Sequence, residues 1–343
     1  MSEPPEATAV QTAAPETPRG RRGRRSVDVP ALVAGARDGD ARSVARLISL
    51  VEDASPALRE VAAALAPHTG NAQVLGLTGS PGVGKSTTTT ALVRAFRAQG
   101  KRVGVLAVDP SSPFSGGALL GDRVRMQDHA GDSGVYIRSM ASRGHLGGLA
   151  WATPQALRVL DAAGCDVVLV ETVGVGQSEL EIASLADTTL VLVAPGMGDG
   201  IQAAKAGILE VADVFVVNKA DRDGAQQTVR DLRYMQSLGG RFAEPGHWRP
   251  PIVKTVAARE KDNGIDEVLE KIEAHREWLA SSGEGHRRRT ERAAREIEAI
   301  AVATLRERLG DVHGSAALGT LAEKVVAGEI DPFSAADDLV GQL

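Results

Sequence analysis

The sequence predicts an α/β protein built on a doubly wound, mostly parallel sheet, and three observations indicate this class. Short apolar runs typical of buried strands alternate with helical segments along the middle of the chain. A glycine-rich segment, residues 79–86, lies between one such run and a helix-like stretch. Helical patterns flank this central region on both sides. The expected strands lie near Val74, Val103, Val135, Val167, Leu190, Val214 and Ile252.

The chain divides into four parts by pattern. Residues 1–27 predict a disordered tail, because they are rich in proline, glutamate, alanine and threonine and end in an arginine cluster. Residues 28–68 predict a helical extension, since apolar residues recur at three- and four-residue spacing and Asp40 and Ser55-Pro56 supply helix starts. The doubly wound domain is expected over 69–280, and a helical arm over 281–343.

Residues 79–86 form a complete phosphate-binding loop of the pattern G-x-x-x-x-G-K-S. The glycines let backbone N–H groups surround an anion, and the helix that follows presents its positive dipole end. Lys85 can reach the β and γ phosphates, and Ser86 can ligate Mg²⁺. A nucleoside triphosphate is therefore the first expected ligand. The residues predicted to hold it here are Gly79, Ser80, Pro81, Gly82, Val83, Gly84, Lys85, Ser86 and Thr87.

The base is predicted to be guanine because of the motif Asn218-Lys219-Ala220-Asp221, which follows a strand-like run. A carboxylate at Asp221 accepts from N1–H and N2–H of guanine, a donor pair that adenine lacks. The Asn218 amide can pair with the base edge, and the stem of Lys219 can cover the base plane and brace the phosphate loop. Ala257 and Ala258 are expected to close the site against guanine O6. The alternative for Asp221 is a helix N-cap.

Two acids at predicted strand ends are candidates for a metal site. Asp109 follows the run 103–108, and Glu171 follows the run 166–170. In many GTPases an Asp-x-x-Gly holds Mg²⁺ through water, and its glycine contacts the γ phosphate; here Glu171 and Gly174 take those places, with one more methylene in the acid. Mg²⁺ accepts one or two carboxylates and keeps several waters. For both acids a helix cap is the alternative.

The last part, residues 281–343, predicts a helical arm. A linker is expected over 281–285, followed by a charged helix over 288–309 and a second helix that stops at Gly328. Asp331-Pro332 should open a third helix as N-cap and first helical residue. So short an arm cannot bury its apolar stripe alone, so it must pack either on a second copy or on its own domain.

Composition excludes several classes of protein. The 343 residues are 43% hydrophobic, enough for one nucleotide-binding domain with smaller flanking parts. A net charge of −5 without a basic stripe in the folded region gives nucleic-acid binding little support. No apolar stretch approaches the ~20 residues that span a bilayer. The single cysteine, Cys165, cannot form an internal disulfide, which fits a reducing cytoplasm.

With these residues in place, the chain resembles the MeaB/ArgK family of P-loop GTPases, which are G-protein chaperones of adenosylcobalamin-dependent methylmalonyl-CoA mutase. The resemblance runs from about residue 33 to the C-terminus. It rests on the motifs Val108–Pro113, Gly121–Met126, Glu171–Glu179, Pro195–Gly207, Asn218–Asp221 and Asp331–Ala336.

The resemblance implies a SIMIBI-like G domain that binds GTP, GDP and Mg²⁺, a mutase as partner, and homodimerisation through the C-terminal arm. It places a first switch at 122–126, a second after Glu171 and a third at 196–205. The residue roles that it implies are catalysis by Lys85, Glu171, Asp122 and Gln177, and metal binding by Ser86, Asp109, Asp122 and Glu171. Val175 stands where Ras-like proteins place a water-orienting glutamine, so intrinsic hydrolysis should be slow, with Gln177 the nearest replacement.

Two other functions stay open at this stage. One is a P-loop kinase or ATPase linked to basic amino acid transport, which would need a base site that accepts ATP; Asp221 speaks against it. The other is a nickel-insertion GTPase, which would need a cluster of cysteine and histidine ligands, whereas the histidines are scattered and Cys165 stands alone.

Overall fold

The structure, a computed structural model, describes residues 27–53, 55–110, 129, 131–142, 152–172, 182, 184–196, 208–238, 246–309 and 316–341. The predicted tail, apart from Val27, lies outside these residues. Among the described helices, none is long and apolar enough to cross a membrane.

The centre of the molecule is a seven-stranded sheet in the order β3-β2-β4-β1-β5-β6-β7, as far as the described residues show. Every adjacent pair of strands is parallel, so the predicted doubly wound fold is confirmed and the sheet is parallel throughout. Each expected strand is present. Their bounds are β1 Gln73–Thr78, β2 Val103–Pro110, β3 Val135–Ser142, β4 Val167–Thr172, β5 Thr188–Val193, β6 Val214–Val217 and β7 Ile252–Lys254.

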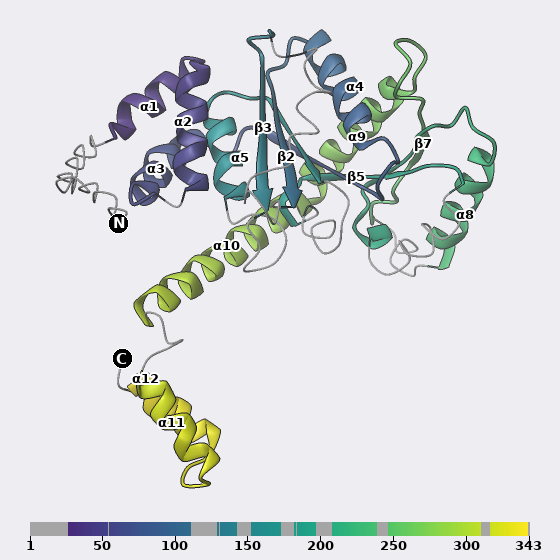
Figure 1. Cartoon of the computed structure of the whole chain (residues 1–343). Coiled ribbons are helices and arrows are strands. Elements are labelled where there is room, and N and C mark those ends of the chain that lie inside the picture. The colour runs from purple at the N-terminus through teal and green to yellow at the C-terminus, as the bar shows by residue number, and fades with distance from the viewer. Residues whose placement is uncertain are drawn as a thin grey trace, which may run out of the picture.

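Helices cover both faces of the sheet (Figure 1). α4 (Lys85–Ala98) and α9 (Ile265–Ser282) bury their apolar sides against one face. α5 (Thr153–Ala162) and α8 (Ala225–Leu238) pack on the other. Strands buried on both faces need apolar side chains at nearly every position, which explains the continuous runs seen in the sequence. A short 3-10 helix, η5 (Ile208–Val211), precedes β6.

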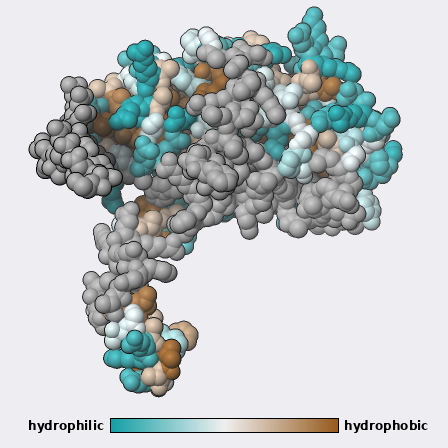
Figure 2. Space-filling view, viewed as in Figure 1, coloured by the Kyte–Doolittle hydropathy of each residue, from teal (hydrophilic) through white to brown (hydrophobic). Residues whose placement is uncertain are grey.

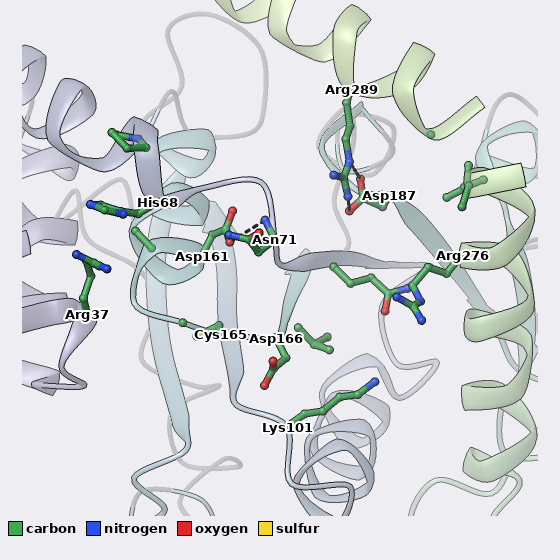
Figure 3. Close-up of a pocket in the computed structure, with 18 of the residues that line it drawn as sticks. Arg37, His68, Asn71, Lys101, Asp161, Cys165, Asp166, Asp187, Arg276 and Arg289 are labelled. Atoms are coloured by element: carbon green, nitrogen blue, oxygen red, sulfur yellow. Dashed lines mark hydrogen bonds and ion pairs between the residues drawn. The ribbon is translucent and has the colours of Figure 1, made fainter. Parts of the chain in front are cut away.

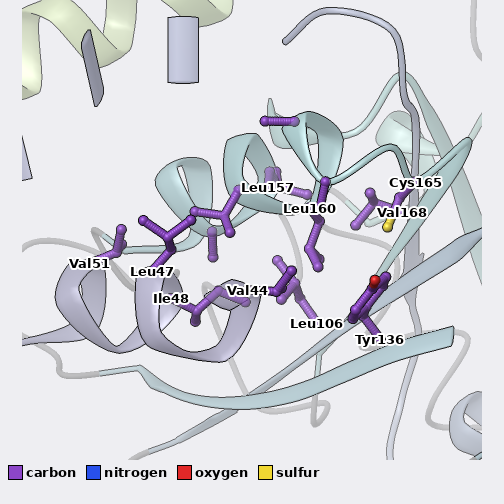
Figure 4. Packing of buried hydrophobic residues seen from close by; sticks show 14 of the residues in the cluster. Val44, Leu47, Ile48, Val51, Leu106, Tyr136, Leu157, Leu160, Cys165 and Val168 are labelled. Atoms are coloured by element: carbon purple, nitrogen blue, oxygen red, sulfur yellow. The ribbon is translucent and has the colours of Figure 1, made fainter. Parts of the chain in front are cut away.

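The N-terminal helices pack against α5 and extend the core on that face (Figure 4). Asp40 caps α2, and its carboxylate accepts from the backbone N–H of Arg42 and Ser43, as predicted. The predicted start at Ser55-Pro56 was early. Ser55 instead forms a turn whose carbonyl accepts from Leu58 N–H. These helices are α1 Val29–Arg37, α2 Ala41–Glu52, α3 Leu58–Leu65 and the 3-10 helix η1 Ala66–His68.

The predicted linker over 281–285 is wrong. α9 continues to Ser282, and α10 (Glu284–Leu309) begins two residues later. Only Gly283 separates them, with a left-handed φ of 75°. The hydroxyl of Ser282 donates to the carbonyl of Trp278 at 2.7 Å. Serine and glycine therefore mark a tight helix end here, not a flexible spacer.

α11 (Ala316–Val326) and α12 (Pro332–Gly341) pack against each other and lie beyond the far end of α10 (Figure 1). The Asp331 carboxylate accepts from the N–H of Phe333 at 2.8 Å and from the N–H of Ser334 at 3.1 Å. The Ser334 hydroxyl also donates to this carboxylate, and together these bonds hold the pKa of Asp331 below its usual range. The predicted start of the third helix is thus confirmed.

Candidate functional site

The loop between β1 and α4 has the backbone shape that a phosphate cradle needs. Gly79, Gly82 and Gly84 have positive φ values of 141°, 79° and 100°, a region that side chains disfavour. Gly79 is also pressed against the sheet, since a Cβ there would lie 2.3 Å from the Leu192 carbonyl oxygen at the end of β5. α4 begins directly at Lys85, so its first N–H groups face the loop.

Two lysines donate hydrogen bonds to backbone carbonyls of the loop. The buried Lys85 ammonium donates to the carbonyls of Gly79 at 2.5 Å and Ser80 at 3.3 Å. The Lys219 ammonium donates to the Gly82 carbonyl at 2.6 Å, and Lys219 itself has a left-handed φ of 56°. A phosphate chain would replace the loop carbonyls as acceptor of the Lys85 ammonium, while the Lys219 bond braces the loop.

Glu171 lies at the end of β4 with its carboxylate buried under α4. Its Oε1 accepts from the Ser86 hydroxyl at 2.6 Å, and its Oε2 lies 2.8 Å from the Thr89 hydroxyl. The side chain is 2% exposed. The Ser86 hydroxyl gives its hydrogen to Glu171, and its oxygen is a hard ligand of the kind that Mg²⁺ prefers. A hydroxyl beside a carboxylate is a donor set of hard oxygens, so these residues fit Mg²⁺.

Within the described ranges no group of three histidine, cysteine or acidic side chains is placed to hold a metal ion. A Mg²⁺ site of the kind expected here does not need such a group, because phosphate oxygens and water complete its coordination.

Asn218 joins three segments that lie far apart in the sequence. Its amide N–H donates to the Val83 carbonyl at 2.8 Å, and its amide oxygen accepts from the Thr255 hydroxyl and the Ala257 N–H, each at 3.1 Å. The residue is 3% exposed. The side chain that was expected to meet the base therefore holds the phosphate loop and the 255–258 loop together, while its contact with a base stays a prediction.

Asp221 and Ala258 are exposed at the same edge. The Ala220 N–H donates to the Thr255 carbonyl at 3.0 Å, which ties the Asp221 turn to the 255–258 loop. The buried Ala257 gives its N–H to Asn218. Ala257 and Ala258 were both predicted to meet guanine O6. The Asn218 side chain binds the N–H of Ala257 and not that of Ala258.

Other predicted site residues lie beyond what the structure describes. Asp122, Gly174 and Gln177 fall outside the described residues. Asp109 is the seventh residue of β2, beside Ala141 of β3 in register, but its side chain falls outside the description. The roles expected of these four residues stay predictions.

Thr89 was not among the predicted site residues. It stands in a run of four threonines, 87–90, and is fully buried. A helix turns 100° per residue, so only one of the four can face Glu171, but the pattern does not say which one.

The opposite, amino-terminal edge of the sheet holds a cavity of about 1120 Å³ between the N-terminal helices and the α9–α10 corner (Figure 3). Two of the carboxylates that line it, those of Asp161 and Asp166, accept hydrogen bonds from backbone N–H groups. Asp161 accepts from the N–H of Asn71 and Ala72, and Asp166 accepts from Arg102 N–H at 2.7 Å. Burial raises the pKa of the Cys165 thiol to about 12, so this cysteine is unreactive at neutral pH. The cavity is therefore a junction between parts of the fold and carries none of the predicted site residues.

The same edge anchors α10 through two acids that precede strands. Arg288 donates to Asp213 at 3.1 Å, and Arg292 donates to Asp187 at 3.2 Å. Farther along, Glu296 accepts from Arg158 at 2.6 Å. The first half of α10 is thus held against the sheet and its helices by ion pairs that are partly buried.

Beyond these ion pairs the arm presents apolar side chains to solvent (Figure 2). Ile297 is 68% exposed and Leu305 57%, while Val326 and Phe333 on the following helices reach 89% and 84%. An apolar stripe of this size on a short arm needs a cover that the described part of a single chain does not supply.

Comparison with known proteins decides the family. A sequence model of the family described as "Methylmalonyl Co-A mutase-associated GTPase MeaB" matches residues 44–313. The chain belongs to this family. A Pyrococcus abyssi protein named as a GTPase is 48% identical over 91% of this chain and 96% of its own length. GTPase ArgK of Escherichia coli is 40% identical over 72% of this chain and 76% of its own length.

Two further similarities extend the picture of this MeaB-family chain. The mouse protein named "Methylmalonic aciduria type A homolog, mitochondrial" is 35% identical over 75% of this chain and 65% of its own length. A crystal structure described as "LAO/AO transport system kinase" superposes with a TM-score of 0.67 at 27% identity, over 93% of this chain and 98% of that one. As a MeaB-family P-loop GTPase, the chain binds GTP and GDP and is a GTP hydrolase.

Proposed function

We propose that this GTPase is the G-protein chaperone of an adenosylcobalamin-dependent methylmalonyl-CoA mutase, which it helps to load with intact cofactor and to protect or reactivate. The observation that carries the proposal is the match of residues 44–313 to a family described as mutase-associated. The name of the mouse relative points the same way. We propose a cytoplasmic location for this cycle, which a chain with a single cysteine fits.

In this proposal the nucleotide lies along the carboxyl edge of the sheet. The loop 79–87 surrounds the phosphates, the Lys85 ammonium turns from the loop carbonyls to the β and γ phosphates, and Asp221 accepts from the guanine edge. Ser86 and Glu171 hold Mg²⁺, together with Asp109 and Asp122. The bound Mg²⁺ supplies charge neutralisation at the phosphate oxygens. Gly174 contacts the γ phosphate, and Gln177 assists in placing the attacking water.

The arm is proposed to mediate homodimerisation. Its exposed apolar side chains include Ile297 and Leu305 on α10 and Phe333 on α12. The ion pairs of Arg288 and Arg292 fix the start of α10 on the domain, so the stripe is presented at a defined angle. A second copy of the arm offers the same apolar surface, as a two-fold interface requires.

The proposal is tested with the purified chain and an adenosylcobalamin-dependent methylmalonyl-CoA mutase from the same organism. We expect the two proteins to co-elute, with an elution that differs between GDP and a non-hydrolysable GTP analogue, and we expect the mutase to change the rate of phosphate release. A Lys85→Ala variant should lose the nucleotide dependence. Absence of both co-elution and an altered GTP turnover would remove the chaperone role.

The base assignment is tested separately by competition between GTP and ATP. Asp221→Asn should remove most of the preference for GTP, whereas Asp223→Asn, an exposed acid two residues on, should retain it. An unchanged preference in Asp221→Asn means that the guanine assignment is wrong. Phosphate recovered on a protein acceptor instead of in solution would favour the kinase alternative.

A further inference from the structure

Thr89 makes a contact that the phosphate-loop motif does not contain. It lies on the inner side of α4, one turn after Lys85, with no exposed surface. Its hydroxyl oxygen is 2.8 Å from Oε2 of Glu171 and 3.1 Å from the Lys85 carbonyl oxygen. Both oxygens of the buried Glu171 carboxylate are therefore engaged from α4, one by Ser86 and one by Thr89.

The Thr89 hydroxyl has one hydrogen and two acceptors within reach. The Lys85 carbonyl already receives the N–H of Thr89, since both residues belong to the regular part of α4. The carboxylate is an acceptor only, and a buried charged oxygen without a donor is costly. The shorter distance also favours the carboxylate. The hydrogen therefore points to Glu171.

The second bond matters because this acid is a glutamate. Its terminal torsion is broad, so the orientation of the carboxylate depends on the groups that bind its two oxygens. The Thr89 bond to Oε2 adds a constraint on this torsion to the one that the Ser86 bond places on Oε1. Ser86 and Thr89 are three positions apart on the same helix, so they approach the carboxylate from neighbouring turns.

We propose that Thr89 is a positioning residue that fixes the Glu171 carboxylate for Mg²⁺ binding. The proposal rests on the function proposed above, in which Ser86 and Glu171 hold the metal. Loss of a group that orients a metal ligand typically lowers metal affinity by about 10- to 100-fold. We expect a change of that size in Mg²⁺ affinity and little change in nucleotide affinity measured with excess EDTA, because Thr89 does not belong to the loop that surrounds the phosphates.

The test is a Mg²⁺ titration of the full chain loaded with a fluorescent N-methylanthraniloyl GDP, which requires no turnover. Thr89→Val keeps the shape and removes the hydroxyl, and Thr89→Ser keeps the hydroxyl. The control is Thr90→Val, which removes a hydroxyl that donates to the Ser86 carbonyl at 3.0 Å. We expect the Mg²⁺ dissociation constant to rise by about 10- to 100-fold in Thr89→Val, and to stay near wild type in Thr89→Ser and Thr90→Val.

A folded Thr89→Val protein with the wild-type Mg²⁺ dissociation constant overturns the proposal. If Thr89→Val does not fold, Thr89→Ala takes its place in the same titration. If neither folds while Thr90→Val does, the hydroxyl serves the fold and the proposal is also overturned. These outcomes are distinguishable from failure of the proposed metal site itself, which would appear as GDP release from the wild-type chain that does not respond to Mg²⁺.

Discussion

Replacing Asn218 with alanine separates the role that its sequence motif suggests from the role that its contacts show. The side chain makes three buried hydrogen bonds, to the Val83 carbonyl, the Thr255 hydroxyl and the Ala257 N–H. Alanine leaves all three partners unpaired in a site that is 3% exposed. At about 1 kcal/mol for each bond, the free energy of unfolding should fall by about 3 kcal/mol.

The assay is urea unfolding of the nucleotide-free protein, followed by GDP binding to the folded variant. The control is Asn263→Ala, which removes two hydrogen bonds, to the Arg259 carbonyl and from the Ile265 N–H, at a half-buried position and should cost about 1 kcal/mol. If Asn218 acted only on the base, the nucleotide-free stability of its variant would match the wild type. That result would refute the bracing role.

Three further outcomes are expected. Burial lowers the His275 pKa from 6.5, so on acidification the unfolded chain takes up a proton before the folded chain does, and the free energy of unfolding falls below about pH 6.5. The loss, measured by urea titration, is up to about 1.4 kcal/mol at pH 5.5 and should be absent in His275→Gln. Gly79→Ala should abolish GDP binding or folding, because its Cβ would lie 2.3 Å from the Leu192 carbonyl oxygen. In Gly82→Ala the new Cβ has no atom within 4 Å, so GDP affinity and urea stability should fall less than in Gly79→Ala. Ile297→Glu should lower the mass measured by light scattering if the arm forms a dimer, while Tyr234→Glu on α8, 65% exposed, should not.

The strands and the phosphate loop could be predicted because local sequence determines them. The central strands, such as β4 and β5, are short apolar runs buried on both faces, the pattern typical of a parallel sheet covered by helices. The phosphate loop has a fixed spacing of glycines followed by a lysine. In the structure Gly79, Gly82 and Gly84 have the positive φ values that this motif predicts. Local rules were also sufficient for the caps at Asp40 and Asp331.

The prediction failed where one local pattern is compatible with both a linker and a helix end. Serine and glycine at 281–285 are typical of a flexible linker, but here they end α9, and α10 begins at Glu284. The deciding contacts are the hydroxyl bonds back to Trp278, which depend on α9 continuing that far. Composition alone does not predict the extent of α9, because buried apolar residues such as Leu279 hold the helix in place, not the serines.

The site itself depends on the register of the strands, which no local pattern of residues determines. Glu171 meets Ser86 and Thr89 because β4 pairs with β1 in the register that sets Glu171 beside Leu77, on the face covered by α4. A shift of β4 by one residue would turn Glu171 to the opposite face and bring Thr172 under α4 in its place. The apolar residues Val168 and Val170 are buried on the other face with α5 and the N-terminal helices, and Leu169 is buried with α4. Packing on both faces therefore selects the register, and the register puts a single carboxylate where two hydroxyls of α4 can hold it.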